Sequence, residues 1–488
     1  MTKWIFVCLI GALLLTGCDN RIKILKRAKK YYQKDDFVAA IEQYERLIDS
    51  YEGGDTKTLG LAEAHYFIGE IYLEKQNKPD LAEKKFLQAL KHYPDYYDAL
   101  FKLGTIYDER KQYAEAEEYL DQAVKVFPQQ AEARSLLAQV LWTRGTQMRD
   151  ELRELLKESD SDSEEVQAFQ KAMVEKIQRA IQHRGVLVNL EPTPENFFKL
   201  AEAYKEVESW NDAINAYREA LRRQPSDLDA RFGLMEALIR TQMLDGALKM
   251  AERTIEDFPA ESEPYIIRGR VYALLGENDK AIEELDAALK WADAAEAIDI
   301  KYDLARVRTA MEHYDTAVAI IEQIDKDQPN EDRSRLLLAE IYSKQERWGQ
   351  ALEELNKYLE NNPTDLGAET QKGYFMAMKD MEQGIGFLKE LGEKNPNAFS
   401  VPMALAQVYA RKQQAGQALE SLNQAVEKGF VNYTLLYGDE TFEQVLQEKG
   451  FIQLIRKIQE NIRQSTIRSL IPEEKPVVEE EPVLPEEM

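Results

Sequence analysis

Cysteine is nearly absent from this chain of 488 residues. The two that occur, Cys8 and Cys18, both lie close to the start. No cysteine is left in the long remainder, which excludes a fold held together there by disulfide bonds. The remainder must therefore be stabilised by the burial of apolar side chains.

Signatures of catalysis and of metal binding are also missing. The four histidines are far apart in the sequence and have no cysteine or histidine at ligand spacing. There is no phosphate-binding glycine loop, no dinucleotide fingerprint and no nucleophile elbow. The sequence therefore predicts no enzyme, no catalytic residue, no cofactor and no metal site. An enzyme subunit with a site assembled on a groove stays open as an alternative.

Positive charge is scarce as well. The chain has 63 Lys and Arg against 88 Asp and Glu, which gives a net charge of −25. Nucleic acids are bound through clusters of Lys and Arg. The balance therefore argues against binding of nucleic acid, or of anionic lipid surfaces, through the body of the protein. It favours basic or neutral protein partners.

What the chain does contain is an alanine that returns at a nearly constant interval. Four of the steps between neighbouring copies are 34 residues long and one is 36. The copies are Ala82, Ala116, Ala213, Ala247, Ala281, Ala317, Ala351 and Ala418. A fixed period in this range is typical of a solenoid, in which each unit buries its apolar face against its neighbours.

The unit at residues 194–227 shows the full pattern. Six side chains fall on the facing sides of two predicted helices: Leu200, Ala201, Tyr204, Ala213, Tyr217 and Ala220. Pro225 ends the unit because proline cannot continue a helix. The pattern resembles the tetratricopeptide repeat family. The resemblance implies an all-α fold, a right-handed superhelical solenoid of about eleven helix-turn-helix repeats that binds other proteins.

One copy of the repeat is interrupted. Residues 131–193 contain about thirty more residues than the period allows. Apolar residues in the extra segment recur at helical spacing on both sides of an acidic, serine-rich stretch at 159–165. We expect an elongated helical hairpin here, with each arm extended by about four turns. The hairpin binds a partner or is a tolerated insertion; both interpretations stay open.

The interrupted copy divides the predicted organisation of the chain. Regular repeats occupy residues 18–130 before it and 194–432 after it. We expect residues 433–470 to form capping helices that cover the last repeat. The proline-punctuated, glutamate-rich segment 471–488 has too few apolar residues for a core and is expected to be a disordered tail.

The first residues form a short apolar segment next to a positive charge. Lys3 precedes the uncharged stretch 4–15, which is too short for a permanent membrane span but typical of a secretory signal. The stretch runs into Leu-Thr-Gly-Cys at residues 15–18, which is similar to the lipobox of bacterial lipoproteins. That resemblance implies a signal peptide at 1–17, acylation (palmitate) at Cys18 and a membrane tether.

The residue after the predicted lipid attachment site bears on location. Asp19 resembles the signal that retains lipoproteins in the inner membrane of enteric bacteria. We therefore expect a protein of the bacterial cell envelope that is lipid-anchored and faces the periplasm, with the inner membrane favoured and the outer membrane open. An uncleaved anchor or a secreted protein with an incidental cysteine are the alternatives.

The family resemblance also implies a concave surface lined by the second, fifth and ninth positions of each first helix. The fifth positions carry aromatic residues: Tyr66, Phe101, Phe198, Phe232 and Tyr302. The second and ninth positions carry acids: Glu63, Asp98, Glu195, Asp229, Glu202 and Glu236. This groove would suit an extended or helical peptide with basic and apolar residues. Alternatively, the acids stabilise helix starts and the aromatics pack between repeats.

These features together predict a non-catalytic scaffold. We expect a membrane-anchored, periplasm-facing lipoprotein whose partners are proteins of an envelope assembly or export complex, with the membrane reached through the N-terminal lipid. An adaptor that recruits peptidoglycan hydrolases or proteases to clients is the alternative. The sequence leaves the pathway and the oligomeric state open.

Overall fold

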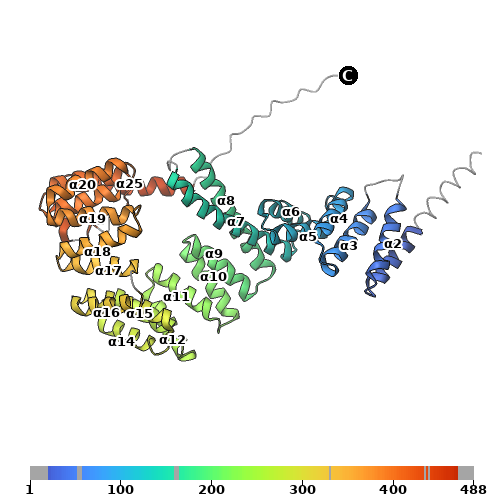
Figure 1. The fold of residues 1–488 in the computed structure, drawn as a ribbon, viewed down its shortest axis with the longest axis horizontal. Helices are drawn as coiled ribbons and strands as arrows, with labels where there is room; N and C mark the ends of the chain where they lie inside the picture. The colour runs from blue at the N-terminus through green and yellow to red at the C-terminus, as the bar shows by residue number, and fades with distance from the viewer. Residues whose placement is uncertain are drawn as a thin grey trace, which may run out of the picture. The chain divides into compact units, whose positions relative to one another are not determined.

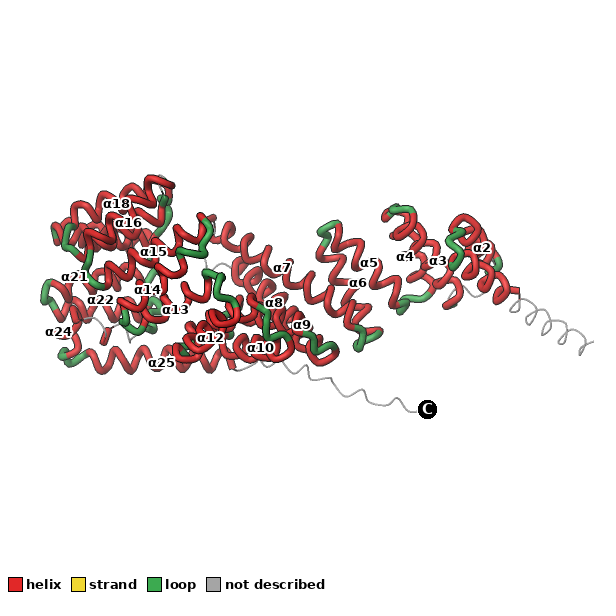
Figure 2. Tube along the Cα trace, turned by 90° about the horizontal axis from the view of Figure 1, so that it is seen from below, coloured by secondary structure: helices red, strands yellow, loops and turns green. Residues whose placement is uncertain are grey.

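The computed structural model describes residues 20–51, 58–158, 164–328, 331–432, 436–437 and 440–470. Throughout these ranges the regular secondary structure is helical (Figures 1 and 2). Several predictions fall on residues outside them: the signal peptide at 1–17, Cys18, Asp19, the centre of the acidic stretch at 159–163 and the tail at 471–488. The chain divides into two compact units, residues 1–254 (unit 1) and residues 255–488 (unit 2).

Unit 1 begins with helical residues 20–32. A single π-helical turn, η1 (Ile71–Lys75), extends one of its helices. The later helices are α2 (Phe37–Asp49), α3 (Leu59–Glu70), α4 (Pro79–His92), α5 (Tyr97–Glu109), α6 (Tyr113–Val126), α7 (Ala131–Glu158), α8 (Glu164–Leu190), α9 (Pro194–Glu206), α10 (Trp210–Arg223), α11 (Leu228–Arg240) and α12 (Leu244–Asp257), whose last residues belong to unit 2.

Unit 2 continues the series of short helices and ends in a 3₁₀ turn, a four-residue helix and a 20-residue helix. Its helices are α13 (Glu263–Leu274), α14 (Asn278–Ala288), α15 (Ala294–Ala310), α16 (Tyr314–Asp327), α17 (Asp332–Lys344), α18 (Trp348–Asn361), α19 (Leu366–Lys379), α20 (Met381–Lys394), α21 (Ser400–Arg411), α22 (Ala415–Glu427), the 3₁₀ turn η2 (Glu440–Phe442), α24 (Glu443–Leu446) and α25 (Phe451–Leu470).

Consecutive helices pack in pairs, from residues 20–32 with α2 to α21 with α22, which makes eleven pairs in the described residues. The periodic alanines explain the pairing, because all eight have no exposed surface. Glycine serves the same purpose elsewhere. A Cβ atom on Gly104 of α5 would come within 2.5 Å of Leu120 Cγ on α6. Small residues therefore mark the crossings, as the repeat pattern predicted.

The turn inside most pairs has one recurrent backbone geometry. Lys111 lies in the left-handed region with φ 60°, and its N–H donates to the carbonyl oxygen of Asp108 at 2.8 Å. The next N–H, of Gln112, donates to the carbonyl oxygen of Tyr107, also at 2.8 Å. These two bonds form a Schellman motif, which ends the first helix and reverses the chain.

The interrupted repeat forms an elongated hairpin, as predicted (Figure 1). Its helices α7 and α8 have 28 and 27 residues, whereas α9 and α10 have 13 and 14. The additional length is about four turns per arm. A cluster of charges attaches α8 to α6: Glu117 of α6 accepts bonds from Lys176 at 2.6 Å and from Arg179 at 2.5 Å.

The end of the last repeat is covered by the elements that follow it. Phe442, Val445, Phe451 and Leu454 are each at most 3% exposed and share one apolar cluster with residues of α21 and α22. These side chains therefore remove the last apolar face of α21 and α22 from water.

Candidate protein-binding surface

Two of the predicted groove aromatics are buried. Tyr302 is 1% exposed, and its hydroxyl lies 2.8 Å from Ser334 Oγ. Tyr66 is 8% exposed and donates to Glu70 Oε1 at 3.2 Å. Neighbouring helices cover both rings, so the aromatic ladder does not extend to these positions. For Tyr66 and Tyr302, packing between helices is the correct interpretation.

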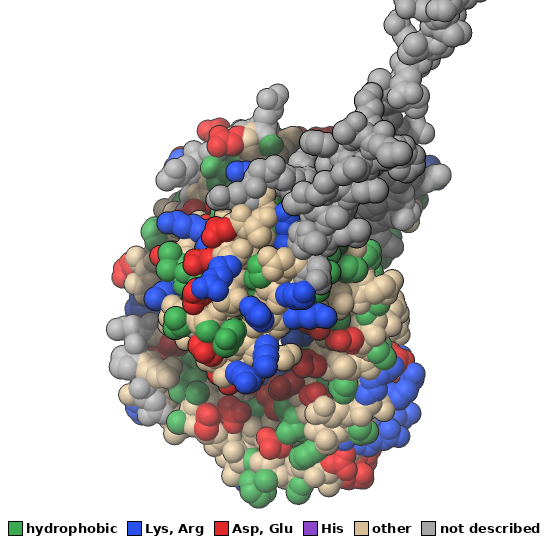
Figure 3. Space-filling view, turned by 90° about the vertical axis from the view of Figure 1, so that its right-hand side faces the viewer, with side chains coloured by type: hydrophobic (Ala, Val, Ile, Leu, Met, Phe, Trp, Pro, Cys, Tyr) green, Lys and Arg blue, Asp and Glu red, His purple; other side chains and the backbone are tan. Residues whose placement is uncertain are grey.

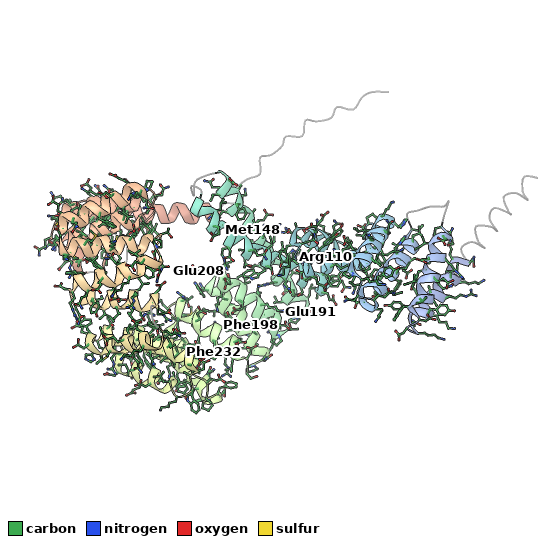
Figure 4. All side chains as sticks on the ribbon, in the orientation of Figure 1. Arg110, Met148, Glu191, Phe198, Glu208 and Phe232 are labelled. Carbon is green, nitrogen blue, oxygen red and sulfur yellow. The ribbon has the colours of Figure 1, made fainter. Side chains whose placement is uncertain are left out.

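The other three aromatics are half-buried and reach the surface. Phe101 stacks on Tyr97 with ring centroids 6.1 Å apart. Phe198 of α9 lies 6.1 Å from the ring of Tyr217, and Phe232 lies on α11 (Figure 4). These residues can contact a partner through part of each ring, and their groove role stays a prediction.

Three of the predicted acids lie at helix starts. Asp98, Glu195 and Asp229 are exposed in the first turns of α5, α9 and α11, where the helix dipole favours a negative charge. The capping bonds of α9 and α11 come from other residues: Thr193 accepts from the N–H of Asn196 at 3.2 Å, for example. Glu195 and Asp229 thus lie where the dipole favours them without acting as caps, whereas burial and the nearby Glu70 raise the pKa of Asp98.

The remaining acids already have partners within the chain. Lys29 donates to Glu63 Oε1 at 2.5 Å. Lys205 Nζ lies 3.0 Å from Glu236 and 3.8 Å from Glu202, which also accepts a bond from the Tyr217 hydroxyl. Because these carboxylates are partly neutralised, their net attraction for a basic peptide is weaker than the sequence suggests.

A cleft of about 320 Å³ opens between the elongated hairpin and α9. It contains two predicted residues, Phe198 and Glu202, beside residues that the sequence analysis did not identify. Its lining comprises Trp142, Thr146, Arg149, Arg184, Phe198, Lys199, Glu202 and Glu206. Two aromatic rings, three cations and two carboxylates therefore meet at one site, which suits a polypeptide with both apolar and charged side chains.

Arg184 is the most unusual group in this cleft. Its guanidinium carbon lies 4.6 Å from the ring centroid of Trp142, and Nη1 donates to the carbonyl oxygen of Lys199 at 2.9 Å. Burial lowers the pKa of this side chain to about 10. Within the described part of the chain it has no carboxylate in ion-pairing contact. It is thus a half-buried cation that can accept an external anion.

Arg149 adds a second incompletely bonded guanidinium. Its Nη1 lies 3.2 Å from Glu206 Oε2, but its Nε is buried without a hydrogen-bond partner. A buried donor without an acceptor costs free energy. Sequence reasoning missed Arg149 and Arg184 because both lie on the interrupted repeat, where the 34-residue register does not apply.

A larger cleft of about 760 Å³ lies near the starts of α3 and α5 and the end of α6. Its lining includes three tyrosines, Tyr93, Tyr96 and Tyr97, and the predicted Asp98. Leu59, Tyr93 and Phe127 in its wall are 56%, 41% and 52% exposed. Its aromatic residues lie at or next to helix ends, so a prediction limited to the second, fifth and ninth positions of each first helix does not include them. The three tyrosines between Tyr93 and Tyr97 could nevertheless have been noticed in the sequence.

Two general findings concern the described ranges as a whole. Among these residues, no group of three or more His, Cys, Asp or Glu side chains is placed to hold a metal ion. Nor does any helix within them combine the length and apolarity needed to cross a bilayer.

Comparison with known proteins identifies repeats along much of the chain. Models of the tetratricopeptide repeat match residues 73–140, 206–270, 308–368 and 262–294. Among solved structures, yeast Tom70 is similar over 92% of this chain and 97% of the Tom70 chain, with 14% sequence identity and a TM-score of 0.43.

Two curated relatives are named for different processes. Cellulose synthase operon protein C of Pseudomonas fluorescens is 25% identical over 370 residues, which is 70% of this chain and 27% of that protein. The Hsp70-Hsp90 organizing protein of Triticum aestivum is 26% identical over 228 residues, which is 43% of this chain and 39% of that protein. The matches thus span less than half of either relative.

Proposed function

Because the chain belongs to the tetratricopeptide repeat family, we propose that it is a lipid-anchored, periplasm-facing scaffold for an envelope assembly or export complex. Stacked repeats present a long surface on which other proteins bind. The mechanism is positional: the anchor fixes the location, and the repeats hold partners near one another. No bond of a partner is made or broken.

The cleft between the hairpin and α9 supports this proposal most directly. Phe198 and Trp142 give it an apolar wall, while Arg184 supplies a charge that Glu202 stabilises from a distance but that no described carboxylate contacts as an ion pair. Apolar side chains give binding energy, and a fixed, partly desolvated guanidinium gives orientation. A segment of a partner protein can use both at once.

The charges in the cleft change the chemistry expected of that partner. A basic peptide would meet carboxylates that Lys205 and Tyr217 already occupy. An acidic group would meet Arg184, and Arg149, which contacts Glu206 through Nη1 only, adds positive charge beside it. We therefore propose a partner segment with an apolar side chain next to an Asp, a Glu or a C-terminal carboxylate.

The envelope location is supported by the N-terminal sequence. The lipobox-like residues 15–18 after an uncharged stretch favour acylation at Cys18. One relative is named for an operon of cellulose synthase, which is compatible with an export complex. Changing Cys18→Ser should release the protein from the membrane fraction and abolish metabolic labelling with palmitate. Retention of both would contradict the anchor.

Site-specific photo-crosslinking in the native host tests the cleft. A photo-reactive residue at Phe198 should crosslink to a defined envelope protein. The same probe at Arg218, an exposed position on α10, should not. Equal crosslinking from both positions, or from Arg218 alone, would contradict a specific site at the cleft.

The charge of Arg184 can be tested in the same experiment. Arg184→Gln should lower the yield of the Phe198 crosslink about tenfold or more, because a hydrogen bond between charged groups is lost. Arg218→Gln removes the same charge from the surface and should leave the yield unchanged. An unchanged yield in Arg184→Gln would show that the partner uses only the apolar wall.

A further inference from the structure

The start of unit 1 has a charge opposite to that of the whole chain. Residues 20–34 contain seven Lys and Arg and no Asp or Glu, in a chain with a net charge of −25. The first acid after this segment is Asp35. The overall charge therefore conceals a short, entirely cationic segment.

The structure arranges this segment as a helix with two different sides. Ile24, Leu25, Ala28 and Tyr32 face inward and join the apolar cluster formed with α2 and α3. The exposed side carries Lys23, Lys26, Arg27, Lys30 and Lys34. Lys23, Lys26, Arg27 and Lys30 recur at helical spacing on one face, opposite the buried face, and Lys34 lies in the turn that follows the helix.

Most of the exposed cations are not used by the fold. The side chains of Lys26, Arg27, Lys30 and Lys34 form no ion pair or hydrogen bond with any described residue. By contrast, Arg21 on the inner side donates to the carbonyl oxygen of Ser50 at 2.8 Å. Like charges at this spacing repel one another, so the fold alone gives no reason to collect them.

Figure 3 looks onto the side of the molecule on which α2 lies in Figure 1. Lys and Arg side chains gather near the centre of this face, with Asp and Glu side chains around them. Two apolar side chains border the cationic row, Ile22 and Tyr31, which are 51% and 38% exposed. Cations with flanking apolar and tyrosine side chains are typical of helices that lie in a membrane interface.

We infer that the cationic face of residues 20–34 binds the anionic headgroups of a lipid bilayer. Its charge complements such a surface, and its first described residue is two positions after Cys18, the predicted lipid attachment site. A basic patch beside a lipid anchor adds a second, electrostatic attachment to the same membrane. The patch also orients unit 1 on the membrane. This inference goes beyond the proposed scaffold function and does not depend on the cleft.

Vesicle co-sedimentation of an unlipidated chain tests it. The chain from residue 18 with Cys18→Ser keeps every described residue and carries no acyl group. It should bind vesicles of phosphatidylglycerol and phosphatidylcholine, not vesicles of phosphatidylcholine alone, and added salt should weaken the binding. Changing Lys26, Arg27, Lys30 and Lys34 to Gln should weaken it on the order of a hundredfold or more.

A matched control removes the same number of charges elsewhere in unit 1. Lys84, Lys91, Lys111 and Lys249 are exposed and likewise have no ion pair with a described residue. Their replacement by Gln should leave vesicle binding within about twofold. Circular dichroism of both variants verifies that each one folds.

Three outcomes would overturn the inference. The first is equal binding to neutral and anionic vesicles, or full binding by the fourfold variant of the cationic face. The second is binding that appears only when residues 472–488 are deleted, which would assign the face to the acidic segment of the chain itself. The third is tighter binding of a DNA oligonucleotide through the same four residues.

Discussion

Units 1 and 2 share the same interior but present different surfaces. Ala213 in unit 1 and Ala351 in unit 2 are both fully buried at equivalent crossings. At the ninth position of the first helix, however, two neighbouring repeats of unit 1 have Glu202 and Glu236, whereas the first two repeats of unit 2 have Arg270 and Arg306. The comparison shows that close helix crossing constrains the interior of every repeat, while surface positions are free to diverge in charge and therefore in partners.

The largest expected effect tests the shared interior. A Cβ atom on Gly384 of α20 would lie 2.1 Å from the backbone nitrogen of Ala377 on α19. The backbone cannot move aside easily, so Gly384→Ala should destabilise unit 2 by about 3 kcal/mol or more. Urea denaturation followed by circular dichroism, with hydrogen exchange to localise the loss, measures this effect.

The same helix supplies the control. Gly386 is exposed, and an added Cβ there would meet nothing within 4 Å. Gly386→Ala should therefore stabilise α20 by about 1 kcal/mol through helix propensity alone. If both substitutions changed the free energy of unfolding in the same direction, the close approach of the two helices would not be the reason for a small residue at Gly384.

The interior was the part of the molecule that the sequence predicted best. The alanine period predicted which residues are buried, because a crossing tolerates only small side chains at a fixed position in each pair. The interrupted repeat predicted α7 and α8 for a related reason: apolar spacing shows where a helix continues even when the period fails. Both inferences depend on local geometry alone.

The surface was harder to predict, because the position of a residue in the repeat predicts the direction of its side chain and not what covers that side chain. Tyr66 and Phe198 occupy equivalent positions, yet the ring of Tyr96 from the next repeat packs 5.3 Å from Tyr66. Phe198 instead borders a cleft beside the elongated hairpin. Arg184 lies on that hairpin and has no equivalent in a regular repeat.

Lowering the pH should destabilise unit 1 more than unit 2. His65 in unit 1 is 8% exposed, and burial, together with nearby Lys85 and His92, lowers its pKa to about 4. Burial also lowers the pKa of His183 in unit 1. Below the ordinary pKa of 6.5, the unfolded chain takes up protons that the folded unit does not. Unit 1 should therefore lose stability as the pH falls from 6.5 to about 4, by up to about 3 kcal/mol for His65.

Hydrogen exchange corrected for intrinsic rates measures this difference across the same pH window. Protection of α3 should fall more steeply than protection of α15, since unit 2 contains only His313. His65→Phe removes the titrating group and should reduce the slope in unit 1 to the part that His183 contributes. If protection fell equally steeply with pH in the two units, the buried histidines would not be the cause.

A smaller effect concerns how the hairpin is held. Glu117 has 12% of its side chain exposed and receives both Lys176 and Arg179 from α8. Glu117→Gln should cost about 2 kcal/mol, since two half-buried cations lose their shared carboxylate. Hydrogen exchange should increase mainly in α8. Glu42→Gln breaks the exposed pair with Arg46 and should cost less than about 0.5 kcal/mol; a similar cost would mean that burial does not strengthen the Glu117 cluster.

The smallest effect concerns the turns, where one repeat of unit 2 departs from the others. Lys111 in unit 1 adopts φ 60°, and Glu312 and Glu346 in unit 2 adopt 60° and 58°. By contrast, Gly276 of unit 2 occupies the same turn position at φ 76°. A side chain in this region raises the energy of the backbone, and glycine does not, although glycine also increases the entropy of the unfolded chain. Lys111→Gly should therefore gain at most about 1 kcal/mol, and Gly276→Lys should lose a similar amount, because nothing lies within 4 Å to contact the new side chain. Urea midpoints that move in these opposite directions would locate the difference in the backbone. A loss in Lys111→Gly would instead mean that the lysine side chain stabilises its turn by more than the strain it introduces.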